Sequence, residues 1–493
     1  MAVATGRDFA VIVTEDGNIC TSGDNMYGQL GVGDFVRHEE PCLLKHVDTF
    51  GGHEVVMVAV AGFMCACVTK DGSLWTWGEN TIGVLGQPMA APVTEHLQSR
   101  PRRLCMSLHG DSPVLMVACG ENFVLVLTIS GEIWSFGQGM RYELGHGIRE
   151  TSTVPKRIDP AAFDNAEIGM IAAGGRHCLA LSKTGGRVWS WGLNSMGQTG
   201  AGSEYVEADP GYPPWWFVRV PTLIPAAVLE GGSVVFVSCG PDFSALVTVD
   251  GVVWACGSNA YNECGLGDNV DNVDDSHVFQ RVGGEEYFGA GGVRMVSCGS
   301  SHTILLAKDN TVWTYGCGAH GELASAYTTD ALAVGASRRP HRVDFSIFHN
   351  SDSEGSQDND IVVVTAGRQC SFAITSGGSV YLWGSGHNRM FRDLQKAYNQ
   401  PTWVPCMLPA RVLGLADNSV ENARAGRWHY MRRDAISAFV MGTLPRFSVN
   451  SAIPSNSNFP GEMLRGLFRG MRFAPRQQTS HGTRALLGLE DDQ

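Results

Sequence analysis

A few residue groups in this chain have spacings that could support chemistry, and each also fits a repeated structural position. Gly316-Cys-Gly-Ala-His-Gly321 matches the glycine spacing of a dinucleotide-binding turn. Such a site needs a following helix whose N-terminus holds the pyrophosphate. These glycines instead belong to one copy of a loop that recurs along the chain, so we interpret them as a structural turn. The sequence contains no P-loop, nucleophile elbow or HExxH motif, and it therefore predicts no catalytic residue and no cofactor.

Cysteine and histidine residues are the candidates for metal binding. Cys65-Ala-Cys67 and the pair Cys317 and His320 both lack a second pair of ligands at zinc spacing, so no metal site is predicted. His177 and His302 share a repeat position with phenylalanines, which favours buried, hydrogen-bonded structural histidines. Cysteines also repeat beside a glycine, which indicates small apolar packing residues rather than redox chemistry. These phenylalanines and cysteines are Phe9, Phe123, Phe243, Cys119, Cys239 and Cys298.

One aromatic and basic segment has the composition of a binding hot spot. It lies in the long connection between Gly192 and Gly240 and follows Tyr212-Pro-Pro. Tryptophan and arginine are enriched where interfaces bury most of their binding energy. The same composition also suits a loop that folds back and buries its own aromatic rings, and both interpretations stay open. The candidate partner contacts in this segment are Trp215, Trp216, Phe217 and Arg219.

The C-terminal part of the chain has a different composition. Residues 443–493 are rich in proline, serine, asparagine and glycine and show no repeat, which predicts a flexible, disordered tail. Segment 463–476 is basic and amphipathic, because its apolar residues and its arginines both recur at helical spacing. It could dock into a groove, onto an anionic membrane or onto the acidic remainder of the chain, or it could stay unstructured. Its candidate contacts are Arg465, Arg469, Arg472 and Arg476.

Charge and cysteine usage limit the partners and the compartment. The net charge is −13, whereas nucleic-acid-binding domains are usually basic. We therefore expect no direct nucleic-acid binding from the main domain. The 14 cysteines are spread singly, and the sequence shows neither an N-terminal signal peptide nor an apolar run long enough to span a bilayer. These features predict an intracellular protein, cytoplasmic or nuclear, without a transmembrane segment.

The elements that position these residues form a repeat. Short strand-like segments flank two-residue turns such as Asp71-Gly72 and Gly185-Gly186, which accept the positive φ that tight hairpins need. Both arms of each hairpin show period-two alternation, as in residues 73–77. An isolated hairpin is not stable, but hairpins can stack radially around an axis. The glycine that closes each hairpin recurs about every 60 residues, at Gly23, Gly78, Gly137, Gly192, Gly257, Gly316 and Gly384.

Seven copies predict an all-β fold, a seven-bladed β-propeller with four-stranded blades, over residues 1–442. Segments 25–31, 77–80 and 191–198 resemble the W-G-x-N-x-x-G-Q-L-G signature of the regulator-of-chromosome-condensation (RCC-type) repeat family, and 174–177 and 299–302 resemble its G-x-x-H anchor. An eighth anchor at 425–429 could supply a strand that closes the ring. The sequence departs from the signature where Tyr142, Asn262 and Arg389 replace a mid-loop glycine and where Ala324 replaces a later one.

The resemblance implies a non-catalytic protein-interaction scaffold or regulatory module, a monomeric propeller whose partners are other proteins. The alternative is the founding activity of the family, guanine-nucleotide exchange on a Ran-like small GTPase. Exchange factors of the family project a wedge from the third blade and carry a basic N-terminal arm. In this chain the connection from Gly137 to Gly174 is the shortest of the seven. A light-sensing dimer like the plant ultraviolet receptor of this fold would need repeated Gly-Trp-Arg-His-Thr-like motifs, and only Arg427-Trp-His429 approaches one.

Overall fold

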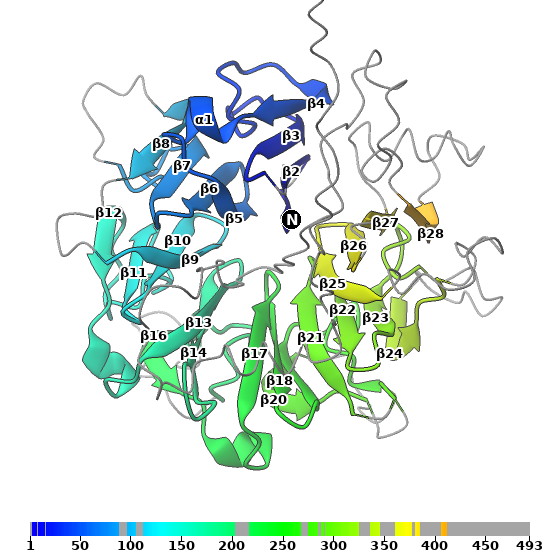
Figure 1. Ribbon diagram of the computed structural model, residues 1–493. Coiled ribbons are helices and arrows are strands. Elements are labelled where there is room, and N and C mark those ends of the chain that lie inside the picture. The colour runs from blue at the N-terminus through cyan, green and yellow to red at the C-terminus, as the bar shows by residue number, and fades with distance from the viewer. Residues whose placement is uncertain are drawn as a thin grey trace, which may run out of the picture.

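The structure is a computed structural model that describes residues 2–411 with internal gaps at 7, 15, 88–95, 105–111, 203–215, 268–274, 284–286, 290, 325–335, 346–359, 377–379 and 385–405. Within these residues, seven four-stranded antiparallel sheets surround a central axis (Figure 1). The predicted seven-bladed propeller is therefore confirmed. The predicted tail 443–493, the boundary at 442 and the eighth anchor at 425–429 lie outside the described residues.

Each blade consists of four strands that are consecutive in sequence, with the first strand innermost. The first three blades comprise β1 (Ala2–Thr5), β2 (Phe9–Val13), β3 (Ile19–Gly23), β4 (His38–Leu44); β5 (Val55–Ala61), β6 (Met64–Thr69), β7 (Leu74–Glu79), β8 (Leu97–Leu104); and β9 (Val114–Cys119), β10 (Phe123–Thr128), β11 (Ile133–Gly137), β12 (Ser152–Arg157). The fourth and fifth comprise β13 (Ile168–Ala173), β14 (His177–Ser182), β15 (Val188–Leu193), β16 (Phe217–Leu223); and β17 (Val234–Cys239), β18 (Phe243–Thr248), β19 (Val253–Gly257), β20 (Ser276–Arg281). The last two comprise β21 (Val293–Cys298), β22 (His302–Ala307), β23 (Val312–Cys317), β24 (Ala336–Arg342); and β25 (Ile361–Ala366), β26 (Cys370–Thr375), β27 (Val380–Gly384), β28 (Cys406–Arg411).

The second strand of each blade is buried on both faces. All six residues of β10 are buried, and so are all six of β14 and β18. The alternation seen in the sequence would leave one face of such a strand in solvent. Radial stacking changes this, because each blade is covered by a neighbour on either side. The hairpin turns are as predicted: Gly72 has φ +80°, and a Cβ there would lie 2.3 Å from Cβ of Pro113.

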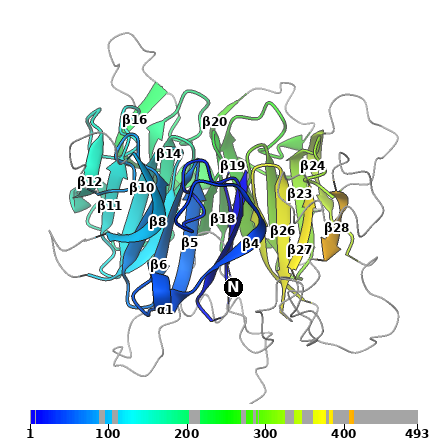
Figure 2. The ribbon, with the colours of Figure 1, turned by 90° about the horizontal axis from the view of Figure 1, so that it is seen from above.

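The two ends of the ring differ in their connections. The hairpin turns and the links between blades share one end with the N-terminus and with α1 (His46–Thr49), as Figure 2 shows. Two other links contain the 3-10 turns η1 (Pro160–Phe163) and η3 (Ala226–Leu229). We call this end the turn face. No helix of the described residues is long and apolar enough to cross a membrane.

The opposite end, which we call the loop face, carries two sets of loops. Inner loops join the first and second strands of each blade, for example residues 120–122 and 174–176. Outer loops join the third and fourth strands, for example residues 24–37 and 138–151. The outer loops hold most of the family signature, and Trp216 and Phe217 lie where one of these loops meets its outer strand, so the loop face is where a site must be sought.

Candidate protein-interaction face

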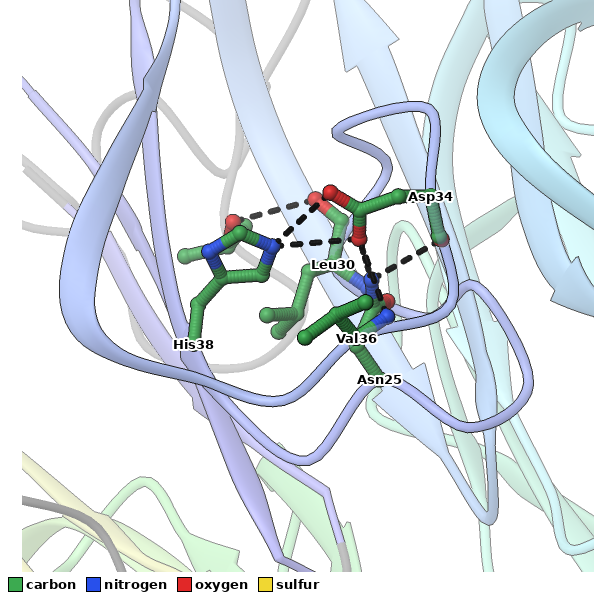
Figure 3. Close-up of polar contacts among 6 residues, drawn as sticks. Asn25, Leu30, Asp34, Val36 and His38 are labelled. Carbon is green, nitrogen blue, oxygen red and sulfur yellow. Dashed lines mark hydrogen bonds and ion pairs between the residues drawn. The ribbon is translucent and has the colours of Figure 1, made fainter.

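The signature asparagine closes the outer loops of the first, second, fourth and fifth blades from within. In the first blade, Asn25 Oδ1 accepts the N–H of Leu30 at 2.9 Å, and its Nδ2 donates to Asp34 Oδ1 at 2.8 Å (Figure 3). His38 Nε2 lies 3.0 Å from the same carboxylate. Hydrogen bonds, first of all from the Val36 N–H, hold the pKa of Asp34 below its usual value. These polar side chains are occupied in fixing the loop, so they present a rigid frame rather than a reactive group.

The glutamine and tryptophan of the signature join one blade to the next. Trp77 Nε1 donates to the carbonyl of Gln29 at 2.9 Å, and Trp191 Nε1 donates to that of Glu143 at 2.8 Å. Trp383 repeats the bond with Glu322 at 2.6 Å. A buried indole N–H needs such an acceptor. The signature therefore encodes the ring itself and not a ligand site.

The repeated histidines have the structural role that the sequence predicted. His177 Nε2 lies 2.8 Å from Ser244 Oγ in the next blade, and His302 Nε2 lies 3.0 Å from Ser371 Oγ. Both rings are buried. Burial lowers the pKa of His177 to about 3 and that of His302 to about 4. Both are therefore neutral near pH 7 and hold adjacent blades together.

The repeated cysteines lie between the inner strands. Burial raises the pKa of Cys119 and of Cys298 to about 12, so these thiols stay protonated and unreactive. Cys239 is likewise buried, with its pKa raised. In the described part of the chain, no three His, Cys, Asp or Glu side chains are placed to share a metal ion.

The predicted aromatic segment begins the outer strand of the fourth blade. Phe217 is 1% exposed, and its ring centroid lies 5.6 Å from that of Tyr142. Trp216 is half-buried, 6.4 Å from Phe217, and Arg219 is half-buried on β16. Phe217 therefore folds back onto the third blade, while Trp216 and Arg219 remain partly accessible. Trp215 lies outside the described residues, as do Arg465, Arg469, Arg472 and Arg476.

Three arginines surround the Tyr142 and Phe217 rings, which are tilted against each other. The Arg149 guanidinium lies 4.7 Å from the Phe217 ring centroid and 5.3 Å from that of Tyr142. Arg141 lies 5.9 Å from Phe217, and Arg219 lies 5.8 Å from Tyr142. We call these five residues the arginine–aromatic cluster. It joins the outer loop 138–151 of the third blade to the outer strand of the fourth.

Sequence reasoning found Phe217 and Arg219 of this cluster and missed its other three members. Tyr142 carried the usable signal, because it stands where the repeat has a glycine. Its φ is +64°, in the left-handed region that is costly for a bulky residue. Such strain persists only where surrounding contacts impose it, and it gathers at functional sites.

The cluster borders a basic pocket. Arg141, Arg149 and Arg176 line a cavity of about 230 Å³ together with Gln138 and Met140. Arg176 comes from the inner loop of the fourth blade, and its Nε donates to Glu121 Oε2 at 3.1 Å. Side chains from two blades thus converge on one small cavity at the loop face.

A larger cavity opens at the loop-face end of the central axis. Its volume is about 710 Å³, and the inner loops of the blades line it. Charges of both signs surround it: Glu79, Glu121, Asp242, Arg176 and Arg368. Burial raises the pKa of Asp242. With both signs present and no row of donors aimed at one point, the cavity has the mixed character of a protein contact surface.

Comparison with known proteins agrees with this architecture. UVR8, the ultraviolet-B receptor of Arabidopsis thaliana, is 32% identical over 269 residues, which are 55% of this chain and 55% of UVR8. RUG3, a mitochondrial RCC1 domain-containing protein of the same plant, is 28% identical over 66% of this chain and 64% of its own length. The chain thus spans less than two thirds of either relative.

A solved structure shares the fold. Prp20p of Saccharomyces cerevisiae, described with its binding properties to Gsp1p and histones, has a TM-score of 0.58 at 20% identity, over 75% of this chain and 81% of that one. At this identity the match concerns the fold alone. The model of the RCC1-like domain matches residues 38–432. The chain therefore belongs to the RCC1-like domain family.

Proposed function

We propose that this chain is a monomeric, non-catalytic protein-interaction module that binds its protein partners on the loop face. The observation that carries the proposal is where large apolar side chains are exposed. Outside the strands, most of them lie at the tips of the outer loops of the first, third, fourth and fifth blades. They are Met26, Phe35, Val36, Met140, Ile148, Met196 and Tyr261.

The turn face offers much less apolar surface. Outside the strands, its exposed large apolar side chains among the described residues are Val47, Ile129 and Val249. Contiguous exposed apolar side chains rimmed by polar groups are typical of protein contact sites. Methionine is well suited to such a surface, because its flexible, polarisable side chain adapts to different partners. The arginine–aromatic cluster adds the residue types that interfaces favour.

Paired loop-face and turn-face variants test the proposal. Met140→Ser with Met196→Ser removes side chains that are 47% and 41% exposed, so the fold should be unaffected. Val47→Ser with Val249→Ser is the matched control on the turn face, at 61% and 63% exposure. Quantitative proximity labelling in cells should show the same partners lost from the loop-face variant and kept by the control. Partners kept by the loop-face variant and lost from the control would place the interaction on the turn face and contradict the proposal.

Guanine-nucleotide exchange on a Ran-like GTPase is the alternative function. It is supported by the shared fold of Prp20p, a protein described with its binding to Gsp1p. Against it, residues 114–157 of the third blade are all described and contain only the four strands β9 to β12. No wedge hairpin projects from this stretch. The rate at which a fluorescent GDP analogue leaves the GTPase distinguishes an exchange factor from a non-catalytic module. Acceleration by substoichiometric protein would establish exchange, and an unchanged rate would favour the module.

The same proposal includes a cytoplasmic or nuclear location and a monomeric state. Twelve cysteines of the described residues are free thiols, which fits a reducing compartment, the cytoplasm or the nucleus. The relative RUG3 is mitochondrial, so imaging of the tagged full chain must include a mitochondrial marker. Sedimentation equilibrium should give the monomer mass.

A further inference from the structure

We propose that the basic pocket lined by Gln138, Arg141, Arg149 and Arg176 binds an oxyanion, the carboxylate or phosphate group of an acidic peptide segment in a partner protein. This inference rests on the proposed function and names the chemistry of the partner. Of the predicted site residues that the structure describes, Phe217 and Arg219 belong to the arginine–aromatic cluster that borders this pocket.

The residues that line the pocket are rich in hydrogen-bond donors. A guanidinium group presents five N–H donors and no acceptor, in a fork that matches carboxylate and phosphate oxygens. Three such groups and the Gln138 amide line about 230 Å³. That volume suits one acidic side chain rather than a whole cofactor, because cofactor pockets usually hold several hundred Å³ or more, roughly 300–1,000 Å³.

The arginines are held in place before a ligand arrives. Arg149 lies over the Phe217 and Tyr142 rings at 4.7 and 5.3 Å, and Arg141 lies 5.9 Å from the Phe217 ring centroid. Ordering a long side chain costs binding free energy, so side chains that are already ordered bind more tightly. The Tyr142 backbone, with φ +64°, adopts a strained conformation that places its ring beneath Arg149. This strain is a second observation, independent of the cavity, that marks the same place.

The neighbouring acidic groups leave the pocket available to an anion. Glu143 is buried, and its carboxylate accepts the backbone N–H of Arg141 at 2.6 Å rather than a guanidinium. Glu121 bonds Arg176 alone, as an exposed pair whose side chains are 52% and 42% exposed. Exposed pairs of this kind are weak, so an incoming oxyanion can share or replace this partner.

The surroundings favour a peptide over a nucleic acid. The central cavity next to Arg176 carries Glu79, Glu121 and Asp242, and the chain has a net charge of −13. An extended phosphodiester backbone would be repelled on leaving the pocket. Met140 and Ile148 flank the arginines at 47% and 48% exposure. The partner segment therefore carries an acidic residue beside an apolar one.

Fluorescence anisotropy with the full chain tests this. The probes are fluorescein-labelled peptides in which leucine alternates with glutamate, with phosphoserine or with glutamine, and a single-stranded DNA oligonucleotide. We expect the glutamate or the phosphoserine peptide to bind, with an affinity that falls as salt rises. Arg141→Gln and Arg176→Gln should each weaken binding roughly tenfold, as the loss of a hydrogen bond to a charged group does.

The matched control is Arg187→Gln. Arg187 also stacks on an aromatic ring, at 4.9 Å from the Trp189 centroid, and pairs with Asp164 at 3.5 Å, but it lies on the turn face. Its substitution should leave peptide affinity unchanged. Melting curves of all three variants should match the wild type, which separates lost contacts from lost folding.

The outcomes are distinct. Binding of the phosphoserine peptide alone assigns the pocket to phosphate, and binding of both acidic peptides assigns it to carboxylates as well. The proposal is overturned if neither acidic peptide binds, if the glutamine peptide binds equally well, or if Arg141→Gln and Arg176→Gln have no effect. DNA binding that the same variants abolish would also overturn it in favour of a nucleic-acid interface. If the arginine variants keep the cellular partners that Met140→Ser with Met196→Ser loses, the module survives and the oxyanion pocket fails.

Discussion

The outer loops of the third and fifth blades have the same backbone and different surfaces. Each replaces the mid-loop glycine, by Tyr142 with φ +64° and by Asn262 with φ +62°. Each continues with a buried glutamate whose carboxylate accepts a loop N–H: Glu143 from Arg141 at 2.6 Å, and Glu263 from Tyr261 at 2.7 Å. Asparagine visits the left-handed region readily, whereas another residue pays roughly 1–2 kcal/mol there.

The difference shows where this fold allows a site to arise. The shared residues of the two loops close the turn and join the next blade. Tyr142 does more than close the turn, because its ring also packs on Phe217 of the fourth blade and beneath Arg149. A repeat fixes the backbone of every loop, so individual departures from the repeat are free to carry function. The following predictions test whether the third loop differs from the fifth in this way.

Phe217→Ala should have the largest effect, since its ring is 1% exposed in a cluster with Tyr142 and Leu193. Truncating a buried phenylalanine costs about 3–5 kcal/mol of unfolding free energy, and we expect the lower end because the cluster is small. Urea denaturation measures it. The control Phe35→Ala, at 47% exposure in the first outer loop, should stay within about 0.5 kcal/mol. Equal losses in both variants would mean that the cluster is not a packed unit.

Glu143→Gln should stabilise the protein, and more strongly at high pH. Burial raises the pKa of Glu143 from 4.5 to about 7. The folded state then binds more protons than the unfolded state between these values, so the wild type loses stability as the pH rises through this window. Removing the charge should raise the free energy of unfolding by about 2 kcal/mol near pH 8 and change it little near pH 4.5. Gln198 already accepts the equivalent N–H, from Met196 at 2.9 Å, so the amide fits.

Glu263→Gln provides the comparison for that measurement. Burial also raises the pKa of Glu263, but Ser258 Oγ donates to its carboxylate at 2.9 Å and counteracts the shift. The increase in unfolding free energy near pH 8 should therefore be smaller for Glu263→Gln than for Glu143→Gln. Thermal melts at both pH values check the order. A larger gain in the fifth loop would show that local hydrogen bonding does not distinguish the two carboxylates.

Tyr142→Gly and Asn262→Gly address the strain directly. Glycine removes roughly 1–2 kcal/mol of backbone strain at position 142. The contacts of the buried ring are lost as well, so we expect the free energy of unfolding to fall by about 1–2 kcal/mol in total. Asn262→Gly should change stability by less than about 0.5 kcal/mol. Urea denaturation tests both, and anisotropy with the acidic peptide should show weaker binding for Tyr142→Gly alone. A more stable Tyr142→Gly would mean that the ring contributes nothing to the loop.

The fold followed from the sequence because its determinants are local and periodic. Two residues, as in Asp71-Gly72, are enough to predict a hairpin turn. Seven copies of the hairpin predict that the blades stack radially. Burial of both faces did not follow from the expected period-two alternation, although β10 is apolar at nearly every position and is covered on both faces by neighbouring blades. Ring closure was also open in the sequence. The structure builds the first blade from Ala2–Thr5 onward and the seventh from Ile361 to Arg411.

The candidate site followed only in part, since its residues come from two blades. Phe217 and Arg219 stood out by composition, whereas Arg141 and Arg176 are single arginines about 35 residues apart with no periodic signal between them. Only the packing of the third blade on the fourth brings them to one cavity. The sequence showed that Tyr142 replaces the mid-loop glycine of the repeat. Only the structure showed why this matters, because it gives the positive φ of Tyr142 and the aromatic and arginine side chains around its ring.

The smallest expected effect concerns Glu121, which pairs with Arg176 at the edge of the pocket. Both side chains are about half exposed, and such pairs contribute less than about 1 kcal/mol, so Glu121→Gln should barely change the melting temperature. Its effect on binding should be larger and opposite in sign. Without the competing carboxylate, Arg176 is available to the ligand, and the acidic peptide should bind a few-fold more tightly, most clearly at low salt. Asp164→Asn, which removes the charge of the exposed partner of Arg187 on the turn face, is the control. Unchanged or weaker peptide binding by Glu121→Gln would mean that Glu121 positions Arg176 rather than competes for it.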